Sequence, residues 1–151
     1  MHTDSLTETL AVLARRLSQT EDPWWILGSA AVYIKGYDPG QVGDIDVLVS
    51  QQDAAKLMSR HGWDNDKDGG TKRYRSGYVL RPSLGGVPVE ILANYEILTR
   101  HGWEPVRPTS RLKVIHSGNA FYVPSDADLI EIFERLGRPK DFDRIRAIQA
   151  R

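Results

Sequence analysis

The chain has 151 residues, of which 40% are hydrophobic and 26% charged, a composition and length typical of one globular domain spanning 1–151 with its own core. Its 20 basic and 20 acidic side chains cancel, which argues against a long nucleic acid or an anionic membrane as partner. It contains no cysteine, which excludes a disulfide framework and a thiolate metal site.

The N-terminal segment predicts a helix rather than a targeting signal. The first ten residues, MHTDSLTETL, are polar and acidic, unlike a signal peptide, and no apolar run in the chain approaches the roughly 18 residues of a membrane span. We therefore expect a cytoplasmic protein. Over residues 5–19, a capping-box pattern of Ser5 and Glu8 precedes leucines at helical spacing, namely Leu6, Leu10, Leu13 and Leu17. This helix is expected to pack against a sheet.

The functional hypothesis depends on the stretch WWILGSAAVYIKGYDPGQVGDIDVLVS, residues 24–50. An apolar strand ends at Gly28-Ser29, a short helix is expected over 30–35, and Asp44-Ile45-Asp46 opens a second strand. Side chains alternate along a strand, so the two aspartates point to the same face. Their charges are best tolerated with a cation between them, and carboxylates suit Mg²⁺ or Mn²⁺, which also bind phosphates. Gly28 would let a phosphate approach the backbone, which suggests a nucleoside triphosphate site.

This order of motifs resembles the nucleotidyltransferase superfamily with the DNA polymerase β-like fold. The pattern of that superfamily is an apolar residue, Gly-Gly or Gly-Ser, a spacer, and then Asp-apolar-Asp on the next strand. The long spacer between Ser29 and Asp44 is closest to the subgroup of lincosamide-modifying enzymes and abortive-infection toxins. The resemblance implies a third carboxylate on a later strand, and Glu90 within VPVEIL, residues 87–92, matches it.

The middle of the chain predicts one helix, a hairpin and a second, short helix. Ser50 is expected to cap a helix over 52–61, and residues 71–81 and 87–92 are expected to pair as strands after a polar loop at 64–70. The sequence Arg-His-Gly-Trp occurs at 60–63 and again at 100–103. We interpret both copies as helix C-termini, so the second copy would end a helix over 95–101. Active-site roles for His61 and His101 are the alternative.

Basic residues on the predicted strand 71–81 are candidate ligands of a triphosphate, although an exposed strand face commonly has such residues too. These candidates are Lys72, Arg73 and Arg75.

The C-terminal third predicts a hairpin followed by two helices. Residues 112–116 and 120–123 flank the turn signal Ser117-Gly118-Asn119. Ser125 or Asp126 is expected to cap a helix that ends at Gly137, and Pro139 is expected to begin another that runs to about residue 150. The segment DLIEIFERLGRPKDFDRI also resembles the tail of the same subgroup. Lys140 is therefore a candidate nucleotide contact, and charges that tie the two helices together are the alternative.

The predicted fold class is α/β (α+β): a mixed, mostly antiparallel sheet flanked by helices, with a C-terminal helix pair at about 125–150. The resemblance implies transfer of a nucleoside monophosphate from a nucleoside triphosphate to a hydroxyl. Asp44 and Asp46 would hold one or two divalent ions, and Glu90 would assist the second or act as general base. Gly28 and Ser29 would position the triphosphate.

The acceptor and the base of the nucleotide stay open at this point. A small molecule such as an aminoglycoside or lincosamide fits the resemblance, as does a side chain of a protein, for instance the partner in a toxin–antitoxin pair; a homodimer also fits. The alternative function is a catalytically degenerate module that binds nucleotide or a partner protein without turnover. The presence of all three carboxylates argues against that alternative, although fold and chemistry are separable.

Overall fold

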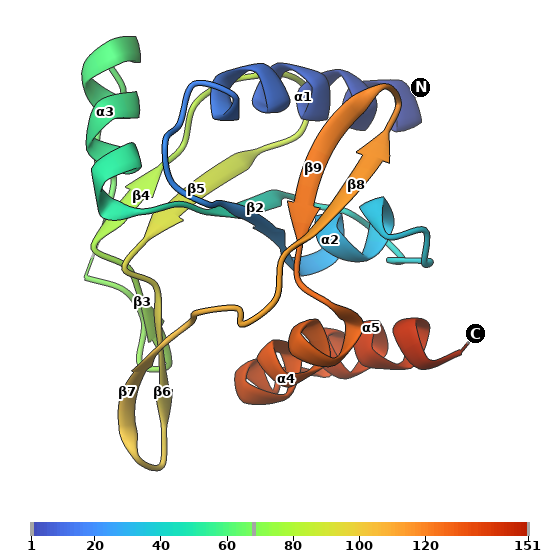
Figure 1. Cartoon of the computed structure of the whole chain (residues 1–151). Helices are drawn as coiled ribbons and strands as arrows, with labels where there is room; N and C mark the ends of the chain where they lie inside the picture. The colour runs from blue at the N-terminus through green and yellow to red at the C-terminus, as the bar shows by residue number, and fades with distance from the viewer. Residues whose placement is uncertain (1, 68, 151) are drawn as a thin grey trace.

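A four-stranded sheet in the order β1-β2-β5-β4 forms the centre of the structure, a computed structural model that describes residues 2–67 and 69–150 (Figure 1). The inner strands β2 (Ile45–Leu48) and β5 (Val89–Ala93) run parallel. The outer strands β1 (Trp25–Leu27) and β4 (Tyr78–Leu80) run antiparallel to their neighbours. The predicted mixed, mostly antiparallel sheet is thus confirmed, and its parallel pair brings together two segments far apart in the sequence.

Five helices of the described ranges surround this sheet, and the C-terminal pair lies on the opposite side from the first helix (Figure 1). They are α1 (His2–Leu17), α2 (Gly28–Ile34), α3 (Gln51–His61), α4 (Asp126–Leu136) and α5 (Pro139–Gln149). The predicted caps hold at α3 and α4, where Ser50 and Ser125 accept the first-turn N–H groups and Gly62 and Gly137 end each helix in the left-handed region. None of the helices in the described ranges combines the length and the apolar character that a membrane crossing requires.

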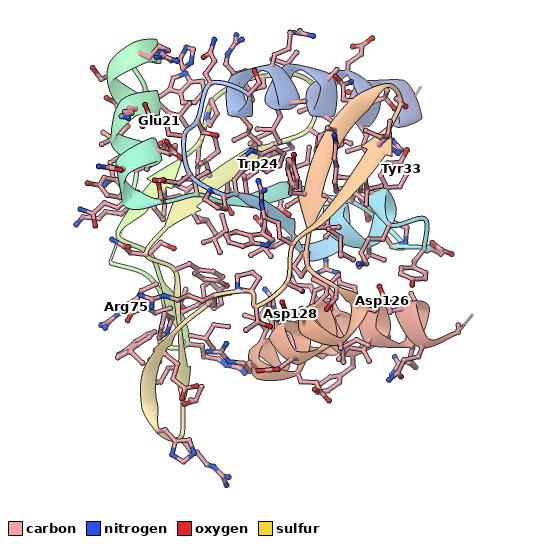
Figure 2. The ribbon with its side chains drawn as sticks, in the orientation of Figure 1. Glu21, Trp24, Tyr33, Arg75, Asp126 and Asp128 are labelled. Atoms are coloured by element: carbon pink, nitrogen blue, oxygen red, sulfur yellow. The ribbon has the colours of Figure 1, made fainter. Side chains whose placement is uncertain are left out.

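The core lies between the helices and the central sheet. The predicted leucine face of α1 is buried there, together with strand residues such as Ile26, Ile45 and Ile91. Phe121 and Phe133, from the C-terminal third of the chain, are buried in the same core. Contacts of two aspartates of α4 fix this helix beside the C-terminal end of α2 and beside Ser110. The Lys35 ammonium lies 3.1 Å from Asp126, and Asp128 accepts hydrogen bonds from Ser110; both aspartates are labelled in Figure 2.

The helix predicted over 95–101 is wrong, because this segment forms the hairpin of β6 (Glu96–Thr99) and β7 (Gly102–Pro105). Its side chains alternate as in a strand: Ile97 is 1% exposed and its neighbour Leu98 42%. Gly102, at φ +102°, begins β7 just after the turn, whereas Gly62 in the first copy of the motif ends a helix. The sequence Arg-His-Gly-Trp therefore occurs once at the end of a helix and once at the turn of a hairpin.

The single strand predicted over 71–81 is in fact two strands in two sheets. β3 (Tyr74–Arg75) pairs with β6, and β4 pairs with β5. The predicted C-terminal hairpin is confirmed as β8 (Leu112–His116) and β9 (Asn119–Val123). Most of the loop predicted at 64–70 lacks regular structure, and Asp68 lies outside the described residues.

We expect Ser50→Ala to lower the free energy of unfolding by about 1–2 kcal/mol. The Ser50 hydroxyl accepts the Asp53 N–H at 3.0 Å and donates to Asp22 at 2.7 Å, so the substitution removes a helix cap and leaves Asp22 short of a donor. Urea unfolding measures the loss. Ser18→Ala is the control, because the Ser18 hydroxyl makes one exposed bond at the end of α1 and should cost less than about 0.5 kcal/mol.

Candidate active site

Asp44, Asp46 and Glu90 come together at one end of the parallel strand pair. Asp46 on β2 stands directly opposite Glu90 on β5, and Asp44 precedes β2 by one residue. Each of the three side chains offers one carboxylate oxygen, and these oxygens all lie within 4.8 Å of one another. The parallel register, rather than the strand alternation alone, therefore makes the acidic triad.

The electrostatics of the triad fit a divalent cation. Burial, followed by the charges of Asp44 and Glu90, raises the pKa of Asp46 to about 7. A carboxyl group in this position is stabilised as the anion when a cation neutralises its surroundings. Three carboxylate oxygens are also the donor set that Mg²⁺ and Mn²⁺ prefer. The triad can accordingly hold such an ion.

Gly28 lies directly against the triad. It adopts φ +65°, which disfavours other residue types, and a Cβ atom built on it would stand 3.1 Å from Asp46 Oδ2. Its absent side chain thus makes room for the carboxylate, a role that the sequence pattern did not reveal. Ser29 is only 3% exposed and does not line the cleft described below.

The triad opens onto a cleft of about 350 Å³, a volume suited to a small-molecule site. Its apolar part comes from Leu27, Leu92 and α4, and two aromatic side chains, Tyr74 and Tyr95, lie beside it. Their rings meet edge to face at 6.5 Å. Burial, and then the negative charge of Asp46, raises the pKa of Tyr95, so its hydroxyl stays protonated even in alkaline solution.

Two of the four predicted basic ligands line the cleft. Lys140 reaches it from α5, and Arg75, labelled in Figure 2, reaches it from β3, paired with Glu96 and lying 4.1 Å over the Trp103 ring. Arg73 instead donates to the Leu136 carbonyl at the end of α4, and Lys72 is exposed outside the cleft.

Comparison with solved structures shows which fold this chain has. A crystal structure from Thermotoga maritima, assigned as a nucleotidyltransferase, matches 97% of this chain and 94% of its own with a TM-score of 0.74 and 20% identity. The antibiotic-resistance factor ANT(2'')-Ia in solution matches 99% and 85% with a TM-score of 0.61 and 12% identity. The same factor in complex with adenylyl-2''-tobramycin matches 96% and 86% with a TM-score of 0.56 and 14% identity.

The chain has the nucleotidyltransferase fold. The similarity covers nearly the whole chain, including the C-terminal helix pair. No model of a known protein family and no curated protein sequence matches the chain. The subgroup suggested by the long spacer between Ser29 and Asp44 stays a prediction.

Within this nucleotidyltransferase fold, the cleft has four cations that sequence reasoning did not single out as ligands, namely Lys67, Arg81, Arg138 and Arg144. Arg138 is held by two hydrogen bonds from its guanidinium to the buried Asp141, at 2.7 and 3.0 Å, which raise its pKa. Arg144 could have been found, because it lies four residues after Lys140 and therefore shares its helix face. The C-terminal helix pair thus supplies a positive wall opposite the negative triad.

Proposed function

We propose that the protein is a metal-dependent nucleotidyltransferase, which moves a nucleoside monophosphate from a nucleoside triphosphate to a hydroxyl group. The observation that supports this most is the acidic triad, with three carboxylate oxygens within 4.8 Å at the edge of a cleft whose other charged lining is cationic. The nucleotidyltransferase fold supports the same chemistry. Together they favour a triphosphate as the group that is bound and a nucleoside monophosphate as the group that is transferred.

Each part of the cleft has a role in this proposal. Asp44, Asp46 and Glu90 would hold one or two divalent ions, and Glu90 would accept the proton of the acceptor hydroxyl when it is not a metal ligand. Such ions would neutralise charge on the triphosphate and lower the pKa of the acceptor hydroxyl. The cationic wall of α5, with Lys140 and its neighbours, binds the phosphates, while the apolar and aromatic part has the size and chemistry to hold the base.

The acceptor we favour is a neutral or anionic hydroxyl compound, or a protein side chain. ANT(2'')-Ia was solved with adenylyl-2''-tobramycin, a derivative of a polycationic aminoglycoside. Among the described residues that line the cleft here, the only acidic side chains are the three of the triad. Among these described residues, an aminoglycoside therefore finds no carboxylate outside the triad for its ammonium groups.

The test of the function is release of pyrophosphate from each of the four ribonucleoside triphosphates, with a cell extract as the source of acceptor. Release that requires Mg²⁺ or Mn²⁺ supports the enzyme. A degenerate module, which binds nucleotide or a partner protein without turnover, would release none with any triphosphate.

We expect a nucleoside triphosphate to bind much more tightly with Mg²⁺ or Mn²⁺ than without, because the ion offsets repulsion between the phosphates and the triad. Calorimetric titration with the metal and with a chelator measures the difference. Equal affinity in the two conditions would indicate a metal-independent binding module.

A further inference from the structure

Arg81 forms an ion pair with one member of the triad. Its Nε donates to Glu90 Oε2 at 2.9 Å. Arg81 follows β4, whose register with β5 places Leu80 opposite Ile91, so the next pair in the same register is Arg81 and Glu90. Because Glu90 is also opposite Asp46, a row of charged side chains crosses three neighbouring strands.

The other paired cations of the cleft have partners outside the triad: Asp141 for Arg138 and Arg144, and Glu96 for Arg75. Among the described residues of the cleft lining, Arg81 is the cation whose ion-pair partner is also a candidate metal ligand. Its ion pair is therefore the one that a metal ion on the triad would directly disturb.

A guanidinium and a divalent ion compete at Glu90. The Arg81 N–H occupies one of the lone pairs of the Glu90 carboxylate, and its positive charge repels a second cation nearby. The Arg81 side chain is 46% exposed, and its other hydrogen bond, to the Asp66 carbonyl, is long at 3.4 Å. It can thus leave Glu90 without disturbing the core.

We infer that Arg81 holds Glu90 in the metal-free protein and transfers to the phosphates of the nucleotide when a divalent ion takes its place. This inference rests on the proposed function and assigns Arg81 as a positioning residue of that site. A metal ion alone weakens the Arg81–Glu90 pair and leaves the guanidinium with its long hydrogen bond to the Asp66 carbonyl. A metal ion together with a triphosphate supplies phosphate oxygens, which a guanidinium binds in a bidentate manner. Arg81 thereby couples the binding of metal to the binding of nucleotide.

The experiment measures Mn²⁺ binding to the full chain by calorimetry, alone and with a saturating α,β-methylene nucleoside triphosphate, tried with each of the four bases. In the unsubstituted protein the analogue should tighten Mn²⁺ binding. In Arg81→Gln, Mn²⁺ alone should bind roughly three- to tenfold more tightly, because its competitor is gone. The analogue, in the presence of Mn²⁺, should bind about tenfold more weakly. The factor by which the analogue tightens Mn²⁺ binding should therefore be smaller in Arg81→Gln than in the unsubstituted protein.

Arg135→Gln is the matched control, since Arg135 forms an ion pair with Glu104 and neither residue lines the cleft; the affinity of this variant for Mn²⁺ alone should not change. Arg81→Ala provides the same measurement if the glutamine variant is unstable, which thermal unfolding reveals. Unchanged or weaker binding of Mn²⁺ alone in the Arg81 variants overturns the inference. Absence of Mn²⁺ binding to the unsubstituted protein, even with every analogue, overturns the proposed function instead.

Discussion

Asp46→Asn is expected to reduce nucleotidyl transfer by about two orders of magnitude or more, the loss typical of removing one electrostatic stabiliser. The substitution keeps the shape of the side chain but removes one of the three charges of the triad, at the residue that stands opposite Glu90. A weakened metal site loses the neutralisation of charge at the transferring phosphorus. Pyrophosphate release and Mn²⁺ affinity measure this loss.

Stability should respond in the opposite direction. At pH 8, above the pKa of about 7 that burial and its neighbours impose, Asp46 is ionised and repels the other two carboxylates. In metal-free protein, Asp46→Asn relieves this repulsion, so the melting temperature should stay unchanged or rise. A sharp decrease would show instead that the aspartate has a structural role and that the site assignment is wrong.

Ile45→Val is the control for this position. Ile45 is the preceding residue of the same strand, fully buried in the core on the opposite face. Loss of one methyl group should cost about 0.5–1.5 kcal/mol of stability and leave transfer nearly unchanged. The two substitutions should thus have opposite effects. Asp46→Asn should reduce transfer without a loss of stability, and Ile45→Val should reduce stability with little effect on transfer.

The parts of the site that the sequence predicted are those whose geometry is local. Asp44 and Asp46 share a face because strand side chains alternate, and Gly28 ends the preceding strand. Glu90 was reached only through the resemblance, since its position opposite Asp46 depends on a parallel pairing across more than 40 residues of chain. No periodicity within either strand specifies that register.

The incorrect helix and the missed site residue also depend on strand pairing, which the local sequence does not specify. The helix predicted over 95–101 came from a motif shared with the end of α3, but pairing of β6 with two neighbours satisfied its backbone as a strand instead. Arg81 was missed because its partner becomes visible only with the β4–β5 register. The candidate phosphate ligand Arg73 donates to the Leu136 carbonyl at the end of α4, a tertiary contact that the sequence did not indicate, and its role as a ligand stays a prediction.

Gly28→Ala should impair both folding and catalysis. The residue has φ +65°, where a side chain costs about 1–2 kcal/mol, and this loss should appear in urea unfolding. The added Cβ would also stand 3.1 Å from Asp46 Oδ2, so the carboxylate must shift. Displacement of a metal ligand by a few tenths of an ångström up to an ångström should reduce transfer by about 10- to 100-fold and weaken Mn²⁺ binding.

Gly62→Ala separates the two effects. Gly62 has φ +69°, nearly the same backbone conformation, but a Cβ there would meet no atom within 4 Å, and the residue ends α3 without lining the cleft. It should lose a similar 1–2 kcal/mol and keep its transfer activity and Mn²⁺ affinity. If Gly28→Ala behaves like Gly62→Ala in all three measurements, then Gly28 serves the backbone turn alone. A selective loss of metal binding and transfer in Gly28→Ala would show that the glycine is required to leave space for the carboxylate of Asp46.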